Sequence, residues 1–357
     1  MRSKILVLLL FLTHLSGLSQ SSSKYSNEFL NIGVDARSIG MANAVVSSTN
    51  DVNSTYWNPA GLLNIERDEI SLMHSNYFAN IANYNYISYA KKVDDQSAIG
   101  FSLIRFGVDD IMDTTQLIDN QGNIDFNRIE LFSAADYAFL FSYAKKNNFL
   151  NLNYGLNIKI IRRIIGDFAN SWGFGFDIGI QHENKSGWKF GLMARDITTT
   201  YNSWSFNQDR LDDIQDAIEG QNQEIPEKSE VTLPKLQLGI SKEFLINNEY
   251  SLLGAFDLFV LFDETNDIIS SEIISVNPAL GFELGYIDLV YLRFGVGNFQ
   301  NELQYDSSQK ISFQPNFGIG FNMSNIEINY AFTDIGNQSV ALYSNIFSLK
   351  FNLNIFR

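Results

Sequence analysis

The chain is dominated by segments in which bulky apolar residues alternate with polar or small residues. In residues 172–181, Trp, Phe and Ile take every second position, and Gly, Asp and Gln take the positions between them. The same period of two recurs in residues 150–160, 311–322 and 349–355. Successive side chains of a β-strand point to opposite faces, so this alternation predicts strands with one apolar and one polar face.

The pattern predicts fourteen strands, most of them 9–14 residues long. They are expected at 69–77, 83–91, 97–107, 132–145, 149–162, 172–184, 188–197, 234–246, 249–262, 275–286, 288–298, 311–323, 325–333 and 344–356. Strands of soluble proteins are commonly about 5–6 residues long, whereas a tilted strand that spans a membrane needs about 9–11 residues. The strand length and the even number therefore favour a membrane-spanning antiparallel barrel.

The connections between these strands alternate in length. Short turns are expected near 93–96, 146–148, 184–187, 247–248, 287 and 324, and longer loops at 108–131, 163–171, 198–233, 263–274, 299–310 and 334–343. Only the first hairpin loop, at 78–82, departs from the alternation. Outer-membrane barrels have short periplasmic turns and longer external loops, whereas a soluble β-sandwich predicts neither this alternation nor such long strands. We therefore expect an all-β fold, a transmembrane antiparallel barrel of about fourteen strands, with extracellular long loops and periplasmic termini.

The first twenty residues have the composition of a secretory signal peptide. Arg2 and Lys4 precede the apolar run 5–12, and small and polar residues follow it. This order is typical of a cleaved signal, and the run is too short to span a bilayer, which requires about 20 residues. We expect a signal peptide at 1–20, a separate N-terminal segment at 21–66 and the barrel at 67–357.

Charge is concentrated in the long loops. The chain has a formal net charge of −15, no cysteine, 45% apolar residues and only 18% charged residues. Twenty acidic and four basic residues lie in the loops 108–131, 198–233, 263–274 and 299–310. An acidic protein is a poor partner for nucleic acid, whose phosphates need basic patches, and the absence of cysteine excludes a thiolate metal site. The acidic charge marks the rim that is expected to face outward.

Residues 21–66 do not alternate and are rich in small residues. A barrel of fourteen strands is too wide for its own side chains to fill, so this segment is expected to fold inside the lumen as a plug or hatch. Inward-facing glycines in the pairs Gly173 and Gly175, and Gly295 and Gly297, are expected to make room for it. The residues assigned to the plug motif are Gly33, Arg37, Gly40, Met41, Trp57, Asn58, Pro59, Ala60 and Gly61, of which Asn58 to Gly61 predict a turn.

Arg37 is the one basic residue in an apolar stretch of the expected plug, so it needs a partner in the lumen. By strand alternation, Glu283 and Glu327 face inward and are the candidate wall partners. We interpret the pair as an ion pair between plug and wall; a gating or partner latch is the functional alternative.

The chain offers few groups for catalysis or metal binding. After the expected signal peptide, its histidines are His74 and His182, which lie in strands far apart in order. A catalytic triad or a two-histidine metal site would need them at one organised site. We therefore predict no enzyme activity, no catalytic residue, no metal and no cofactor.

An acidic helix is predicted within the longest loop. Residues 209–219 carry Leu and Ile on one side at helical spacing. Their carboxylates lack the spacing of a calcium-binding loop, so we interpret the cluster as an exposed docking loop. Its candidate residues are Asp209, Asp212, Asp213 and Asp216.

Three stretches carry a family resemblance. They resemble parts of the PorV/PorQ family. Residues 29–44 resemble its opening, and the Tyr-Trp-Asn-Pro-Ala-Gly-Leu sequence at 56–62 resembles its Asn-Pro-Ala-Gly-Leu signature. Residues 329–336, followed by 347–351, resemble its last hairpin. That family comprises outer-membrane barrels of Bacteroidota and is itself similar to the FadL-type transporters.

The resemblance implies an outer-membrane component of the type IX protein secretion system. Such a barrel would bind a large translocon barrel, the C-terminal signal domains of exported proteins, or both, and would shuttle or anchor the exported proteins at the cell surface. A specialised form serving gliding motility or surface components stays open. The alternative is a FadL-like transporter of hydrophobic small molecules, which needs an apolar pocket beside the plug and a lateral opening, with Pro278 and Pro315 as candidate irregularities in the wall.

Overall fold

The computed structural model describes residues 26–353 except 79, 119–120, 150, 218–227, 304–307 and 334–343, without the side chains of 213–217. The expected signal peptide at 1–20 lies outside the described residues. Within them, no helix is long and apolar enough to cross a membrane.

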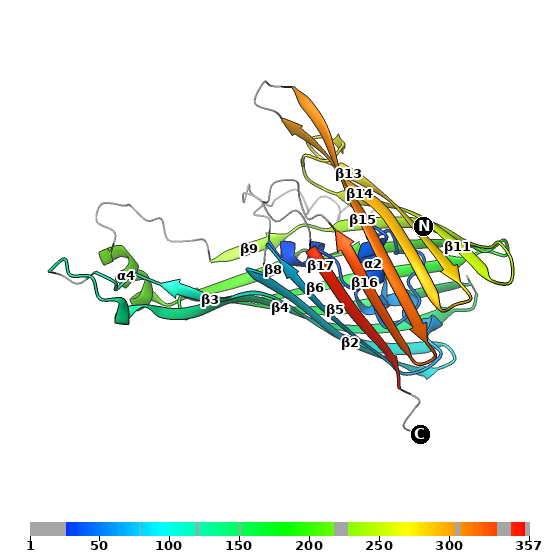
Figure 1. Cartoon of the computed structure of the whole chain (residues 1–357), viewed down its shortest axis with the longest axis horizontal. Helices are drawn as coiled ribbons and strands as arrows, with labels where there is room; N and C mark the ends of the chain where they lie inside the picture. The colour runs from blue at the N-terminus through cyan, green and yellow to red at the C-terminus, as the bar shows by residue number, and fades with distance from the viewer. Residues whose placement is uncertain are drawn as a thin grey trace, which may run out of the picture.

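Fourteen antiparallel strands form a closed barrel (Figure 1). They are Glu69–Tyr77 (β1), Ala82–Asp94 (β2), Ser97–Asp113 (β3), Glu130–Asn147 (β4), Leu152–Ile165 (β5), Ala169–Glu183 (β6), Trp188–Arg195 (β7), Lys235–Leu245 (β10), Tyr250–Leu261 (β11), Ser275–Tyr286 (β13), Val290–Leu303 (β14), Gln309–Met323 (β15), Ile326–Thr333 (β16) and Ser344–Asn352 (β17). The last strand closes the ring on the first, from the pair Glu69 and Asn352 to the pair Asn76 and Asn345. All fourteen predicted strands are present, which confirms the fold class.

The burial of alternate residues shows which face is which. In β6, Trp172 and Phe174 are 50% and 58% exposed, whereas Asp177 and Gln181 are 0% and 6% exposed. A soluble sandwich would bury the aromatic residues and expose the polar ones. The reverse pattern is that of an outer-membrane barrel, whose apolar face contacts lipid.

Three short strands that the sequence did not predict lie in the long loops. They are Thr200–Phe206 (β8), Ser229–Thr232 (β9) and Ile269–Ser270 (β12). Strand β6 pairs with β7 near the short turns and with β8 nearer the long loops, and β9 pairs with β8. The ends of the expected loop 198–233 therefore continue the barrel wall instead of forming a free loop.

Two hairpins project beyond the wall on the long-loop side (Figure 1). One is the extension of β3 and β4, which are 17 and 18 residues long, and the helix Gln208–Ala217 (α4) lies near its far end. The other is the hairpin of β14 and β15. A short 3-10 helix, Phe126–Arg128 (η4), lies in the first projection. The predicted helix at 209–219 is present as α4.

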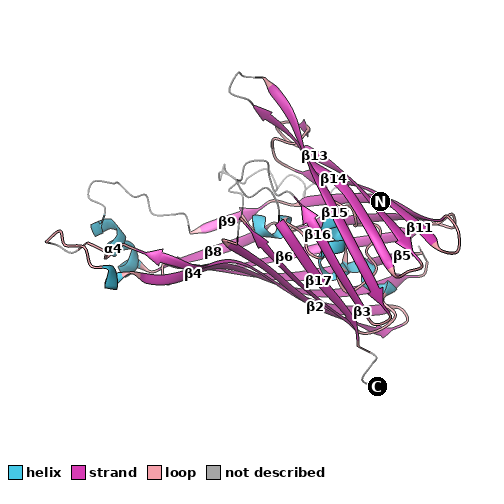
Figure 2. Cartoon of the chain, in the orientation of Figure 1, coloured by secondary structure: helices cyan, strands magenta, loops and turns pink. Residues whose placement is uncertain are grey.

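The N-terminal segment lies inside the ring of strands (Figure 2). Its short helices are Glu28–Asn31 (η2), Ala36–Gly40 (α2), Ser54–Trp57 (α3) and Pro59–Asn64 (η3). Most residues from 26 to 65 are buried, including polar ones. An irregular chain can be buried this deeply only if its backbone groups find partners, and these partners define the site described next.

Candidate functional site

Helix α2 is fixed to the wall through the residue that caps its N-terminus. The Asp35 carboxylate accepts a hydrogen bond from the backbone N–H of Ser38 at 3.3 Å and another from the hydroxyl of Ser348, on β17, at 2.8 Å. The same Ser348 oxygen accepts from the backbone N–H of Ala36 at 3.1 Å. Burial raises the pKa of Asp35, and the nearby carboxylate of Asp51 raises it further.

Arg37, on α2, makes a two-pronged contact with Glu283 of β13. Its Nε and Nη2 atoms donate to the two carboxylate oxygens at 2.8 and 2.9 Å. Both side chains are mostly buried, with 14% and 10% of their surface exposed. Parallel bonds from guanidinium to carboxylate are among the stronger hydrogen bonds in proteins. The structure thus places Arg37 against one of its two predicted partners.

The ion pair belongs to a longer chain of alternating charges along the wall. Glu283 also accepts from Arg293 Nε at 2.6 Å, and Arg293 lies 3.6 Å from Glu327. Glu327 in turn pairs with Lys350 at 2.6 Å, and Lys350 pairs with Asp51 at 2.9 Å. Glu327 therefore pairs with Arg293 and Lys350 and not with Arg37. The Arg37 guanidinium already donates from both Nε and Nη2 to Glu283. This series of ion pairs begins and ends on the N-terminal segment, at Arg37 and Asp51.

The predicted turn at Asn58 to Gly61 is the start of the 3-10 helix η3. The Asn58 side chain is fully buried, and its oxygen accepts from the backbone N–H of Ala60 at 3.2 Å. Its Nδ2 donates to the carbonyl of Val46 at 2.9 Å and to the wall carbonyls of Ile180 and Leu192 at 3.1 and 3.3 Å. One amide thus joins two parts of the N-terminal segment to strands β6 and β7.

Inward-facing glycines allow the N-terminal segment to lie directly on the wall. A β-carbon at Gly295 would come within 2.3 Å of the backbone of Met41 and Ala42, and one at Gly155 within 2.5 Å of Pro59. Similar overlaps would occur at Gly179, Gly191 and Gly281. The wall therefore has glycines, which carry no side chain, at the places where the backbone of the N-terminal segment contacts it.

The prediction for the pair Gly173 and Gly175 is wrong. A β-carbon at Gly173 would collide with Asn202 and one at Gly175 with Thr200. Both of these residues belong to β8 and not to the N-terminal segment. The sequence did not predict β8, so the occupant of this space could not be foreseen. For Gly295 and Gly297 the expected neighbour is present, since Ala42 lies against both.

The remaining residues of the plug motif form the interior packing of the segment. Gly33 has a positive φ of 97° and contacts Asn43 and Trp57. Trp57 is 2% exposed, donates from Nε1 to the carbonyl of Val34 at 3.1 Å and packs edge-on against Tyr56. The other members of the motif are also buried: Gly40 lies against Gly318, Met41 against Gly281, Pro59 and Ala60 against Gly155, and Gly61 against Thr49.

Sequence reasoning missed a second buried group of charges. Lys159, on β5, pairs with Asp177 at 3.0 Å and with Asp196 at 2.6 Å, and all three side chains are less than one tenth exposed. The sequence held a sign of it, because Lys159 occupies a polar position in the alternating segment 150–160. Its partners could not be identified without the register between β5 and β6.

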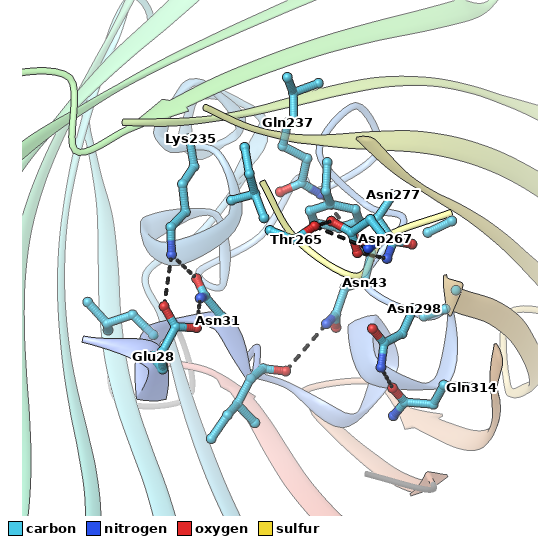
Figure 3. Close-up of a pocket in the computed structure, with 18 of the residues that line it drawn as sticks. Glu28, Asn31, Asn43, Lys235, Gln237, Thr265, Asp267, Asn277, Asn298 and Gln314 are labelled. Carbon is cyan, nitrogen blue, oxygen red and sulfur yellow. Dashed lines mark hydrogen bonds and ion pairs between the residues drawn. The ribbon is translucent and has the colours of Figure 1, made fainter. Parts of the chain in front are cut away.

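A cavity of about 790 Å³ lies between the N-terminal segment and the long-loop ends of the strands (Figure 3). Apolar and aromatic side chains of the segment and wall line one part: Leu30, Ile32, Ile39, Tyr56, Trp57, Tyr77 and Phe259. Amide side chains line the part next to β13, β14 and β15: Asn277, Asn298, Gln300, Gln314 and Asn316. The cavity is therefore amphipathic, with a size typical of ligand sites.

Two basic residues lie at one corner of the cavity, opposite each other in the ladder of β7 and β10. They are Arg195 and Lys235. Lys235 Nζ lies 3.5 Å from the Glu28 carboxylate and donates to the side-chain oxygen of Asn31 at 3.0 Å (Figure 3). Arg195 lies over the ring of Tyr56, with its Cζ 4.4 Å from the ring centre.

The candidate docking helix is attached to the first projection. Arg210, on α4, pairs with Asp113 at 2.7 Å and with Asp167 at 3.0 Å, and it also lies over the ring of Phe168. Asp209 and Asp212 are exposed. Asp213 and Asp216 belong to the same helix, but their side chains lie outside the described residues. The helix thus links the β3–β4 projection to the β5–β6 turn.

The wall next to the cavity has one irregular place. Strands β13 and β14 pair only from Leu280 and Val296 toward the short turns. Closer to the long loops, the loop before β12 replaces β13 as the partner of β14. There the backbone N–H of Ile268 donates to the carbonyl of Phe299 at 3.0 Å, and that of Asn301 donates to the carbonyl of Asn266 at 2.7 Å. Pro278 lies next to this place, whereas Pro315 pairs regularly with Val296.

The fold resembles solved FadL-type structures at low sequence identity. The CymD monoaromatic hydrocarbon channel aligns with a TM-score of 0.54 and 11% identity, over 90% of this chain and 98% of its own. The Pseudomonas putida toluene transporter TodX gives 0.53 and 13%, over 89% and 96%. A Pseudomonas aeruginosa FadL homologue gives 0.50 and 12%, over 89% and 98%. These likenesses show that the chain has the β-barrel fold of the FadL-type structures.

The comparison with family models is more specific than the comparison of folds. Residues 19–187 match the family model of the type IX secretion system protein PorV. The match covers the N-terminal segment and strands β1 to β6. No curated protein sequence gives a significant match. The N-terminal part of the chain is therefore similar to PorV, and the chain as a whole has the fold of FadL-type β-barrels, and together these findings support a PorV-like barrel.

Proposed function

We propose that this barrel is an outer-membrane component of type IX secretion that binds exported proteins, the translocon or both through its long-loop rim. The family match over residues 19–187 is the observation that carries this proposal. In this role the barrel shuttles or anchors exported proteins at the cell surface, and service to gliding or surface components is a specialised form of the same role.

The projections supply the surface on which a protein partner would dock. Several large apolar side chains on the β3–β4 projection are more than half exposed: Met112, Ile118, Ile124, Phe126 and Leu131. Acidic residues lie on the same rim, including Asp209 and Asp212 of α4. In the proposed orientation this rim is extracellular, and the short turns and both termini are periplasmic, as is general for outer-membrane barrels.

The N-terminal segment has the contacts of a plug in this arrangement. It is bonded to the wall on several sides, at Ser348 of β17, Glu283 of β13 and Asp257 of β11. Polar wall side chains satisfy its irregular backbone, for example Asn157, which donates to the carbonyl of Thr55 at 2.9 Å. We infer that a segment held in this way closes the lumen to solutes, and that the barrel carries proteins on its outer rim and not through its interior.

A deletion in the acidic loop tests the docking surface. Removing the whole expected loop 198–233 would also remove β8 and β9, which belong to the wall, so the cut should be confined to 208–227. We expect cells carrying this deletion to export less protein, while the barrel still inserts and shows heat-modifiable migration on a gel. Normal export with an inserted barrel would assign the docking surface elsewhere.

Affinity purification from the native membrane tests the function as a whole. We expect a large translocon barrel or the C-terminal domains of exported proteins to co-purify with the full chain. The Arg162→Gln variant is a suitable control. Among the described residues, Arg162 stacks on Trp172 and donates to Asn170 and Ser171, none of which lines the cavity. Recovery of no secretion component with either form would count against the proposal.

Transport of a hydrophobic small molecule is the second candidate, and the cavity beside the N-terminal segment is the observation in its favour. A FadL-like transporter needs an apolar cavity that continues into a gap in the wall. Here the wall beside β13 is bridged by the loop bonds at Asn266 and Ile268, and amide groups line the adjacent part of the cavity. These amides are hydrogen-bonded to neighbouring wall residues. An apolar ligand would bury their remaining polar groups without partners, which is unfavourable. Uptake of toluene or oleate that depends on this chain would reverse the preference.

A further inference from the structure

We propose that the cavity binds the C-terminal end of a polypeptide, with its terminal carboxylate held by Arg195. The inference rests on the proposed function, because it gives the exported protein a defined point of attachment. It concerns a site inside the rim, apart from the docking surface formed by the projections.

The guanidinium of Arg195 is the group that points to an anionic ligand. Its Cζ lies 4.4 Å from the ring centre of Tyr56 and 5.8 Å from that of Trp57, and both rings are buried. Within the described part of the chain, it forms no ion pair with a carboxylate. The rings hold the planar group in place by stacking and cation–π contact, and they leave its N–H donors unused.

Asp177, whose carboxylate Arg195 influences electrostatically, is already paired with another cation, and Asp267 of the cavity lining accepts from Thr265 and Asn277. Asp177 and Asp196 pair with Lys159 at 3.0 and 2.6 Å, and Asp196 also accepts from the hydroxyl of Thr200. Lys235, the ladder neighbour of Arg195, pairs with Glu28. A guanidinium presents two parallel donors that match the two oxygens of a carboxylate. The available donors of Arg195 therefore fit one carboxylate that enters the cavity.

The rest of the lining fits the chain behind that carboxylate. Amides of β13, β14 and β15 lie across the cavity from the Glu28 and Lys235 corner (Figure 3). Some still have free hydrogen-bonding capacity: Asn298 donates to Gln314 at 3.3 Å through one of its two N–H groups. Such amides pair with the N–H and C=O groups of an extended peptide, and the aromatic part of the lining packs against its side chains.

A terminal carboxylate suits a carrier of many different proteins. Each polypeptide has one such group whatever its sequence, so a single guanidinium can hold unrelated cargoes. Capture of a C-terminal carboxylate is an established mode of peptide recognition. The cavity lies at the long-loop ends of the strands, so a chain end can reach it from the rim where the cargo is proposed to dock.

The test compares two chemical forms of one ligand. The C-terminal domain of a protein exported by the same cell is prepared with its natural carboxylate and, by ligation, as the C-terminal amide. Affinity for the full chain in detergent is measured for the wild type and for Arg195→Gln, Arg195→Lys and the control Arg162→Gln. Arg162 also stacks on an aromatic ring, that of Trp172, but does not line the cavity. Heat-modifiable migration verifies that each variant is folded.

The wild type and Arg162→Gln should bind the acid about tenfold or more tightly than the amide, as expected for losing hydrogen bonds to a charged group. In Arg195→Gln the acid should fall to the affinity of the amide, and Arg195→Lys should recover part of the difference. Equal binding of acid and amide by the wild type overturns the inference and leaves the proposed function intact. Failure of both forms to bind the wild type overturns the proposed function and the inference with it.

Discussion

Arg37 of α2 donates two hydrogen bonds to Glu283 of β13, at 2.8 and 2.9 Å, and so ties the N-terminal segment to the barrel wall. The same carboxylate accepts from Arg293, on the next strand, at 2.6 Å. One carboxylate therefore compensates two buried cations. Removing it leaves both without their shared partner, whereas removing Arg37 leaves the pair of Glu283 and Arg293.

Glu283→Ala should therefore destabilise the barrel more than Arg37→Ala. Breaking a buried ion pair by removing one partner typically costs about 3–5 kcal/mol, and Glu283→Ala does so for two cations. The temperature at which the folded barrel shifts to slower migration on a gel should fall in both variants, and further in Glu283→Ala. An equal or larger fall for Arg37→Ala would show that Arg293 has another adequate partner.

Gly295→Ala should displace the N-terminal segment from the wall. The added methyl would lie 2.3 Å from the backbone of Met41 and Ala42, and overpacking of this kind costs about 1–3 kcal/mol. Limited proteolysis should cut the N-terminal segment faster in this variant. The matched control is Gly254→Ala, where the nearest atoms would be 3.9 Å away. Identical proteolysis of the two variants would mean that the segment does not rest on β14 as described.

Asn58→Ala should loosen the turn that joins the N-terminal segment to β6 and β7. It removes donors from the carbonyls of Val46, Ile180 and Leu192, and a buried group left unpaired costs about 1–3 kcal/mol. Asn64→Ala is the control, since that amide makes a single 3.5 Å bond to Gln181. The gel-shift temperature should fall clearly for Asn58→Ala and little for Asn64→Ala; similar values would deny Asn58 this role.

The barrel was predictable because its sequence pattern is local. Alternation in a segment such as 172–181 depends only on the two faces of one strand, so strand positions followed without knowing their neighbours. Strand β8 was missed because its neighbour β6 has two partners in succession, which a pattern within 200–206 does not reveal.

The site was predictable only in part. Arg37 stood out as a charge in an apolar stretch, and alternation narrowed its partners to Glu283 and Glu327, but only the register of β13 to β16 decides between them. Arg195 carried no distinguishing pattern in the sequence. Its position over Tyr56 depends on contact between residues far apart in the chain.

The attachment of α4 should depend on pH through Asp113, which pairs with Arg210 at 2.7 Å. Against the effect of desolvation, hydrogen bonds from Thr115 and the Arg210 guanidinium lower the pKa of Asp113 below its ordinary value of 3.8. A carboxylate with a lowered pKa stabilises the folded arrangement above its unfolded pKa, and the contribution is lost as pH falls through the folded value. The attachment of the helix should therefore be intact at neutral pH and should begin to weaken only when the pH falls below 3.8.

Arg210→Ala should detach α4 at neutral pH while the barrel remains folded, because the helix loses its contacts to Asp113 and Asp167 together. Spin labels placed at Gln208 and Thr114 would report a wider distance distribution. Arg128→Ala is the matched control on the same projection, since its pair with Asp125 is 3.7 Å long and half-exposed, and such pairs contribute little. An unchanged distribution in Arg210→Ala would show that contacts other than this arginine hold the helix in place.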